Sequence, residues 1–313
     1  MTTTPSGEAY VVPPELDGQR LDKAAAKLAT GLSVARVKRA IEGGHVRVDG
    51  RRRAKGATVA AGETITIVLE EVPSPDAPAV ADPDAPLDVR FESDAVLVVD
   101  KPAGQPTAPL RAGERGTLVN ALLARYPDLA GIGYGPREPG VLHRLDTATS
   151  GLVIVARTAD AFARLRAALL DGRIHKKYLL VCASEGLADE GVIAHPIANH
   201  PKDQRRVLAC VIPRDVMRYA PRQASTRYRV LRRGAEHALV EATVDRALRH
   251  QIRVHFSSIE HPLVGDVLYG SREVVGSTKR HALHASFVGF EGEDGVPPFA
   301  VESPLPLELG ALI

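Results

Sequence analysis

The chain has 313 residues, of which 44% are hydrophobic, and this fits a globular protein of about two domains with packed cores. Its apolar runs are too short to cross a bilayer, and its first residues lack the basic and apolar regions of a secretory signal, so we expect a cytoplasmic protein. Cys182 and Cys210 lie 28 residues apart, which fits neither a disulfide framework nor a paired-cysteine zinc site.

The first 69 residues predict a small α/β module of two helices and a hairpin. Residues 20–28 contain good helix formers, and Ser33 can cap a second helix that Gly43 and Gly44 end. The strings "HVRVDG" and "TITIVL" have the alternation or the β-branched content of strands. The whole chain carries only +2, but residues 1–60 hold 11 Lys and Arg against 6 Asp and Glu, which indicates an anionic partner.

The order "SVARVKRAIEGGHVRVDG" resembles the alpha-L RNA-binding motif of a small-subunit ribosomal protein and several RNA-modifying enzymes. The resemblance covers residues 15–69 and implies that the capped second helix and the turn after it present basic side chains to RNA phosphates. From the residues alone, an ordinary solvated surface on a small helical domain is the alternative. The candidate RNA-binding residues of this module are Ser33, Arg36, Lys38, Arg39, Arg47 and Arg51.

Residues 70–89, "EEVPSPDAPAVADPDAPLDV", contain five prolines and six acidic residues. Proline favours the extended polyproline II conformation and like charges repel each other, so we predict a stiff, extended linker here. The chain is therefore expected to consist of an RNA-binding domain at 1–69, this linker at 70–89 and a larger domain at 90–313.

The larger domain is predicted to be α+β with a mixed, mainly antiparallel sheet, because its strands and helices lack the regular alternation of a doubly wound sheet. One predicted helix, "TLVNALLARYP", follows Thr117 as its cap. The other, "TADAFARLRAALLDG", places Phe162, Leu165 and Leu169 on one face. The predicted strands are "AVLVVDKPAG", "GLVIVART", "KKYLLVCA", "STRYRVLRR" and "HALVEATV".

Two polar segments of this domain can carry chemistry. Asp146 lies in the polar turn of "HRLDTATSGLVIVART", directly before a buried strand, where a scaffold can hold a carboxylate at the rim of a cleft. The second segment is "ALRHQIRVHF"; if residues 251–255 are extended, Arg253 and His255 share one face, and an arginine of this segment could pair with Asp146. The sequence has no phosphate loop, dinucleotide motif or zinc deaminase pattern, so we predict no metal and no nucleotide cofactor.

Several ordered motifs between residues 90 and 307 resemble the RluA-type RNA pseudouridine synthases. The resemblance implies the pseudouridine synthase fold and conversion of uridine to pseudouridine in RNA, with large-subunit ribosomal RNA as the expected target. It departs from the usual family pattern at Ala247, Leu248 and Arg249, and at Ala108 in place of a histidine. The matching motifs are "VLVVDKPAG", "HRLDTATSGL", "KKY", "ASTRY", "HQIRVH", "HPLVGD" and "LHA".

Carried over position by position, the resemblance assigns four roles. Asp146 is the essential carboxylate and Arg253 is its salt-bridge partner. Tyr178 stacks on the target uracil, and Arg144 fills the gap that the target nucleotide leaves in its stack. No cofactor is implied, the partner is RNA, and we expect a monomer.

Three alternatives remain open from the residues. The carboxylate can act as a nucleophile at C1′ of the ribose or as a base at C2′. The target can be transfer RNA, or the chain can be a catalytically weakened ribosome-assembly factor that uses the same groove. A nucleoside hydrolase is disfavoured, because such enzymes usually need a second carboxylate or a metal-bound water.

Overall fold

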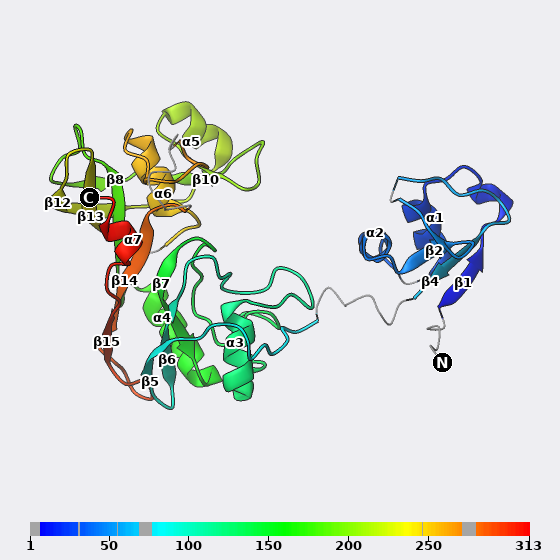
Figure 1. Ribbon diagram of the computed structural model, residues 1–313, viewed down its shortest axis with the longest axis horizontal. Helices are drawn as coiled ribbons and strands as arrows, with labels where there is room; N and C mark the ends of the chain where they lie inside the picture. The colour runs from blue at the N-terminus through cyan, green and yellow to red at the C-terminus, as the bar shows by residue number, and fades with distance from the viewer. Residues whose placement is uncertain (1–6, 31, 55, 69–76, 246, 271–279) are drawn as a thin grey trace. The chain divides into compact units, whose positions relative to one another are not determined.

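The computed structural model describes residues 7–30, 32–54, 56–68, 77–245, 247–270 and 280–313 (Figure 1). The chain divides into two compact units, one of Met1–Ala77 with Arg111–Gly113 and the other of Pro78–Leu110 with Glu114–Ile313. No helix within the described ranges has the length and apolar character needed to cross a bilayer. The two units are called here the N-terminal unit and the large unit.

The N-terminal unit contains the two helices and the strands that the sequence predicts. Its four strands form a sheet in the order β1-β4-β2-β3. The Ser33 side chain caps α2, because its Oγ accepts a hydrogen bond from the Arg36 backbone N–H at 3.3 Å. The elements are β1 (Glu8–Val11), η1 (Pro14–Leu16), α1 (Leu21–Leu28), α2 (Val34–Glu42), β2 (Val46–Val48), β3 (Arg51–Arg52) and β4 (Thr64–Ile67).

Alternation along the strands separates the core of the N-terminal unit from its basic surface. Val46 and Val48 of β2 are buried with Ile65 of β4, whereas Arg47 between the two valines is exposed. Helix α2 buries residues such as Val37 in the same core. The core therefore directs the polar positions of α2 and β2 to the surface.

From residue 78 on, the predicted linker belongs to the large unit. Ala79 N–H donates to Pro136 O at 2.9 Å, and Asp82 N–H donates to Asn120 O at 3.0 Å. The Asn120 amide in turn donates to Val80 O at 2.6 Å. The prediction that residues 78–89 are part of a linker is therefore wrong, because they belong to the large unit and their backbone groups find hydrogen-bond partners on it; residues 70–76 lie outside the described residues.

The large unit is built on a nine-stranded sheet in the order β5-β6-β7-β14-β8-β13-β12-β9, with β15 paired to β14. Among the described strand pairs of this sheet, β7 with β14 is parallel and the others are antiparallel, which confirms a mixed, mainly antiparallel sheet. Its strands are β5 (Val89–Glu92), β6 (Val96–Lys101), β7 (Ser150–Ala156), β8 (Ile174–Ala183), β9 (Glu190–Ile193), β12 (Thr226–Arg233), β13 (His237–Thr243), β14 (Leu283–Phe290) and β15 (Phe299–Glu302).

Helices and a small hairpin surround this sheet (Figure 1). The predicted cap of α3 is confirmed, since Thr117 and Asn120 form a reciprocal capping box. The remaining elements are α3 (Leu118–Arg125), η3 (Pro127–Leu129), α4 (Ala159–Leu170), β10 (Ile197–Asn199), β11 (Val207–Ala209), α5 (Pro213–Tyr219), α6 (Gln251–Ser258) and α7 (Leu307–Gly310).

Strand β7 is buried on both faces, which explains its unbroken apolar sequence. Val153 and Val155 join one core cluster with residues of α3 and α6. Leu152 and Ile154 face the other way, into a cluster that includes Phe162 of α4. A strand covered on both faces is a rigid support for the turn that precedes it.

Residues 251–255 are not extended, so that prediction is wrong. They begin α6, and residues from Gln251 to Phe256 are all buried. The β-branched Ile252 and Val254 favour a strand locally, but packing on all sides of a short helix outweighs that preference. Arg253 and His255 therefore point to different parts of the large unit instead of sharing one strand face.

His255 makes the stability of the large unit depend on pH. Its Nε2 lies 2.9 Å from His195 O and its Nδ1 lies 2.8 Å from the Thr226 hydroxyl, an arrangement that suits a neutral ring. Burial lowers the pKa of His255 from 6.5 to about 4. The unfolded chain therefore binds this proton at a higher pH than the folded chain does.

We predict that the free energy of unfolding decreases as the pH falls from 6.5 to about 4, by up to about 1.4 kcal/mol per pH unit from this one group. Urea denaturation at several pH values measures this slope. His255→Gln is expected to flatten the slope, whereas His175→Gln, at an exposed position, should keep the wild-type slope. Equal slopes in all three proteins would contradict the prediction.

Candidate functional site

Arg253 joins two carboxylates from distant parts of the chain. Its Nη1 donates to Asp146 Oδ2 at 2.7 Å. Its Nε and Nη2 donate to the two oxygens of Asp266 at 2.7 and 2.8 Å, a bidentate pair. The Asp266 side chain is 1% exposed and that of Asp146 is 24% exposed. Asp266 thus holds the arginine from the interior, and Asp146 faces the surface.

The environment keeps the Arg253 guanidinium charged. Burial by itself would lower the pKa of Arg253, but hydrogen bonds and charge interactions with Asp266 and Asp146 outweigh it and raise the pKa above its ordinary value. Arg253 is therefore a charged donor 2.7 Å from Asp146 Oδ2. A carboxylate in this position can act as a nucleophile or as a base.

The turn that carries Asp146, residues 145–150, is held at every residue by the rest of the large unit. Its first residue pairs with Thr107, whose hydroxyl contacts both the N–H and the O of Leu145 at 3.1 and 3.0 Å. The turn also closes on itself, since Thr149 N–H donates to Asp146 O at 3.0 Å. The further partners are Gly104 and Lys101 on Thr147, Arg280 on Ala148 and Ser150, His281 on Thr149 and His284 on Ser150.

Lys101 contributes a buried charge to this support. Its side chain is fully buried, and Nζ donates to the carbonyl oxygens of Pro102, Gln105 and Thr147 at 3.0, 2.8 and 3.3 Å. Burial, with the charge of Arg280 nearby, lowers the pKa of Lys101 to about 8, so the ammonium remains charged at neutral pH. The lysine therefore ties the end of β6 to the turn of Asp146 through hydrogen bonds to main-chain oxygens.

Gly151 allows β7 to approach β14 closely at the end of this turn. Its φ is +113°, and a Cβ at this position would lie 2.2 Å from Ala285 O. A side chain would therefore clash with the parallel pairing of Gly151 with Ala285. This explains the glycine in "TSGL" on steric grounds.

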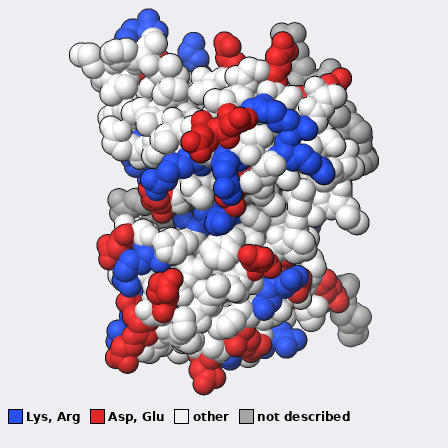
Figure 2. Space-filling view, turned by 90° about the vertical axis from the view of Figure 1, so that its left-hand side faces the viewer, with Lys and Arg blue, Asp and Glu red and all other residues white. Residues whose placement is uncertain are grey.

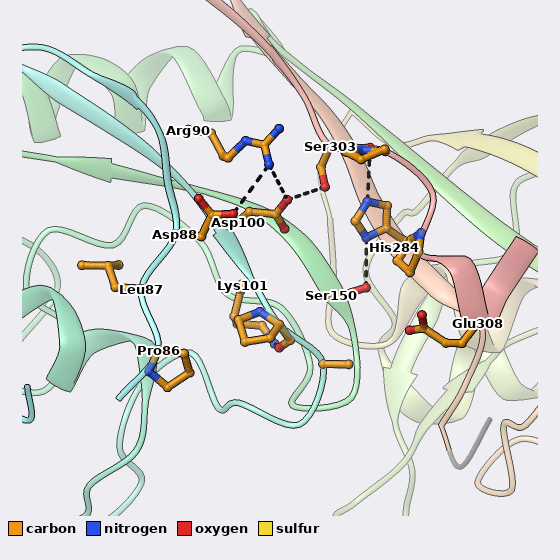
Figure 3. A pocket seen from close by; sticks show the side chains of 14 residues that line it. Pro86, Leu87, Asp88, Arg90, Asp100, Lys101, Ser150, His284, Ser303 and Glu308 are labelled. Atoms are coloured by element: carbon orange, nitrogen blue, oxygen red, sulfur yellow. Dashed lines mark hydrogen bonds and ion pairs between the residues drawn. The ribbon is translucent and has the colours of Figure 1, made fainter. Parts of the chain in front are cut away.

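A polar network behind the turn connects β6, β7 and β14 (Figure 3). His284 Nδ1 lies 2.9 Å from Ser150 Oγ, and its Nε2 lies 3.3 Å from Ser303 O. The Ser303 hydroxyl donates to Asp100. These residues line a cavity of about 510 Å³ that contains none of the predicted catalytic side chains, so we interpret the network as support for the start of β7.

The predicted catalytic residues meet in a different, smaller pocket. Asp146, Tyr178 and Arg253 all line it, together with Arg144 and His250. Tyr178 comes from the middle of β8, opposite Ala242 of β13 and Ala285 of β14. Apolar side chains complete the lining, among them Val244, Leu248, Ile252 and Leu283.

Tyr178 presents a protonated phenol to this pocket. The residue is 5% exposed, and burial, with the negative charge of Asp146 nearby, raises the pKa of Tyr178 well above its ordinary value. Its neighbours on the same face of the sheet are apolar residues such as Leu180 and Ala242. The ring therefore offers a flat, uncharged surface next to the Asp146 carboxylate.

The other predicted RNA-contacting residues are placed on the surface in different ways. Arg144 is half-exposed, and its Nη1 donates to Glu138 at 2.8 Å. In the N-terminal unit, Arg39, Arg47 and Arg51 are exposed. Lys38 lies 3.7 Å from Asp22, so part of its charge is neutralised locally.

The outer face of the large sheet has mixed charge. Strand alternation places Lys177 on the face opposite Tyr178, where it lies 3.4 Å from Glu241. Arg227 of β12 pairs with Asp245 at 2.7 Å. Figure 2 likewise shows basic and acidic side chains close together on one side of the molecule.

Sequence reasoning missed two residues of this site. Asp266 lies in "HPLVGD" and Lys101 in "VVDKPAG", and both motifs carry the family resemblance without suggesting these contacts. Both residues could have been found from their charge, because a lysine or aspartate inside an apolar stretch needs a buried partner.

Comparisons with known proteins agree with this arrangement. Residues 95–258 match the family described as RNA pseudouridylate synthase, and residues 19–65 match the S4 domain. The chain is 36% identical to ribosomal large subunit pseudouridine synthase D of Xanthomonas campestris pv. campestris, over 97% of this chain and 90% of that protein. It is 34% identical to the uncharacterized RNA pseudouridine synthase YlyB of Bacillus subtilis, over 96% and 94%. The structure of human RNA Pseudouridylate Synthase Domain Containing 1 is similar with a TM-score of 0.55 and 25% identity, over 72% of this chain and 87% of that chain.

We predict that Asp266→Asn lowers the free energy of unfolding by about 3 kcal/mol, because it removes a buried partner from a buried charge. Urea denaturation at pH 7 measures the change. The matched control is Asp245→Asn, in the exposed pair with Arg227, for which we expect a change below about 1 kcal/mol. Similar values for the two variants would show that Asp266 does not hold Arg253 as described.

Proposed function

The chain belongs to the family of RNA pseudouridine synthases, which are isomerases, and we propose that it converts specific uridines of large-subunit ribosomal RNA to pseudouridine. One observation carries this proposal. Asp146 is held by Arg253 at 2.7 Å in a pocket that Tyr178 also lines. A carboxylate, a charged donor and a flat ring are the groups that such a reaction needs from the protein.

The reaction rearranges bonds within one nucleotide. The bond from N1 of uracil to C1′ of the ribose breaks, the base turns over, and C5 becomes bonded to C1′. No electrons enter or leave, and no outside group is added, so the chemistry requires no cofactor. The target uridine must leave its stack to reach the pocket, which costs a few kcal/mol and favours loops over intact duplex.

The side chains of the pocket have complementary roles in this scheme. The Asp146 carboxylate contacts the ribose, as a nucleophile at C1′ or as a base at C2′. The Tyr178 ring stacks on the detached uracil and keeps it in place while it turns. Arg253 holds the carboxylate in place by a charged hydrogen bond, and Arg144 at the pocket rim occupies the gap in the RNA stack.

The N-terminal unit contributes to RNA binding in this proposal. Its exposed arginines on α2 and β2–β3 are suited to phosphate contacts, which give affinity without reading sequence. Because this unit is tethered to the large unit, RNA bound to it is present at high effective concentration near Asp146.

The target is inferred from relatives. The protein from Xanthomonas campestris is named as a large-subunit ribosomal enzyme, and the similarity spans both units of the chain. We further propose that the chain acts in the cytoplasm, as a monomer and without a cofactor. Pseudouridine mapping of total RNA from cells with and without the gene identifies the target. If the cells without the gene lose pseudouridine only in transfer RNA, the target is transfer RNA and the ribosomal assignment is wrong.

Asp146→Asn is expected to abolish pseudouridine formation at the target site, because the amide cannot act as a nucleophile or base, while the fold is retained. The measurement is mass spectrometry of RNA nucleosides from a deletion strain that expresses each variant. Asp189→Asn, at an exposed aspartate paired with Arg233, is the control and should restore the modification fully. Modification by Asp146→Asn at the wild-type level would refute the assignment. Rescue of a deletion phenotype by that variant without modification would favour an assembly factor.

The double variant Arg39→Ala with Arg47→Ala is expected to weaken RNA binding. The slope of log Kd against log salt concentration should fall by about two, because each arginine is expected to contribute one phosphate contact. Filter binding at several salt concentrations measures both. Lys23→Ala with Lys27→Ala removes the same charge from the exposed side of α1 and should retain the wild-type slope. If both double variants lose the same RNA affinity and the same salt slope, the net charge of the unit, and not the position of these arginines, determines RNA binding.

A further inference from the structure

His250 stands between Asp146 and a buried tyrosine in an unusual backbone conformation. It precedes α6 with φ 55° and ψ 17°, the left-handed region that residues other than glycine seldom adopt. Its Nε2 lies 3.6 Å from Asp146 Oδ1, and its Nδ1 lies 2.9 Å from the Tyr269 hydroxyl. The left-handed turn thus directs the imidazole into the pocket, and strained backbone of this kind is often found at functional sites.

Tyr269 determines where the imidazole carries its proton. The Tyr269 oxygen already accepts a hydrogen bond from the Val207 backbone N–H at 2.8 Å. The hydroxyl can then donate its own proton to Nδ1 of His250. Burial lowers the pKa of His250, which favours a neutral ring at pH 7. If Nδ1 accepts from Tyr269, the single proton of that ring lies on Nε2, facing Asp146.

Among the described residues, Arg253 and this histidine are the side chains that lie against the Asp146 carboxylate. Arg253 Nη1 holds only Oδ2, and a carboxylate held at one oxygen can still rotate about its terminal torsion, which has broad minima in aspartate. A donor at Oδ1 defines the plane of the carboxylate. The present 3.6 Å is slightly longer than a hydrogen bond, and contacts of this kind commonly shorten when substrate binds.

We propose that His250 is a positioning residue that orients the Asp146 carboxylate through its Nε2–H, with Tyr269 fixing the tautomer. This inference rests on the proposed function for its activity readout. Nothing in the reaction requires His250 to gain or lose a proton, because it acts as a fixed donor. The charged groups that face it are Asp146, Arg253, Arg249 and Asp266.

The same contacts connect the site to the β10–β11 hairpin. Val207 begins β11, and the guanidinium of Arg206, one residue earlier, lies 5.4 Å from the Tyr269 ring centroid. The Arg253 guanidinium lies 5.2 Å from the same centroid. Arg249, next to His250, donates to Arg206 O at 2.8 Å. Tyr269 is therefore held by the hairpin as well as by the site, which makes it a rigid support for His250.

Two substitutions separate a positioning role from a merely structural one. His250→Gln can keep an N–H at the place of Nε2, whereas His250→Asn keeps an acceptor only at the place of Nδ1. Asn tolerates the left-handed conformation better than Gln, so backbone strain alone predicts that the Asn variant is the more active one. If His250 instead acts by orienting Asp146, the Gln variant is predicted to be the more active of the two.

The test uses the full chain and unmodified large-subunit ribosomal RNA transcribed in vitro, with single-turnover rates measured at saturating enzyme. We expect His250→Asn to lower the rate about tenfold with RNA affinity unchanged, and His250→Gln to stay within about threefold of wild type. Thermal unfolding of both variants checks that they are folded. An Asn variant at least as active as the Gln variant would overturn the proposal.

Nitrogen NMR of the histidine rings supplies a readout that does not depend on activity. The His250 signals, identified by their loss in His250→Asn, are expected to show a protonated Nε2 and an unprotonated Nδ1. A proton on Nδ1 would overturn the proposal whatever the RNA result. Failure of the wild type to convert any uridine would instead refute the proposed function and leave the NMR result to decide the role of His250.

Discussion

A buried arginine between two carboxylates is the interaction on which the rest of this site depends. Arg253 lies in a short helix buried on all sides, so its charge must be paired inside the protein. Asp266 supplies both oxygens from the interior, which leaves one guanidinium nitrogen to hold Asp146 at the pocket. The cost of burying this charge is thus offset by contacts that also fix the Asp146 carboxylate at the pocket.

Rigidity of the Asp146 turn follows from the sheet around it. Strand β7 is buried on both faces and pairs closely with β14 because Gly151 has no side chain. Lys101 and Arg280 bind main-chain oxygens of the turn from two other segments. A catalytic carboxylate needs this kind of second layer, since an error of an ångström in its position costs much of the rate.

In the proposed function, the N-terminal unit supplies RNA affinity and the large unit supplies the chemistry. The N-terminal unit exposes arginines on a compact core and is suited to phosphate contacts that do not read sequence. The large unit has mixed charge on the outer face of its sheet and concentrates its chemistry in the pocket on the Tyr178 face.

The sequence by itself determined what depends on local pattern: the Ser33 and Thr117 caps, the paired helices and strands of the first unit, the mixed sheet, and Asp146 as a candidate carboxylate. The roles of Arg253 and Tyr178 came from the resemblance to a known family. The sequence could not determine that residues 251–255 form a helix, because packing on every side outweighs β-branched preference. Nor could it show that residues 78–89 bind the large unit, that Arg253 bridges Asp146 and Asp266, or that Lys101 binds Thr147 O in the Asp146 turn. Arg253 with Asp146 and Lys101 with Thr147 join residues far apart in the chain, and only the folded sheet brings them within hydrogen-bonding reach.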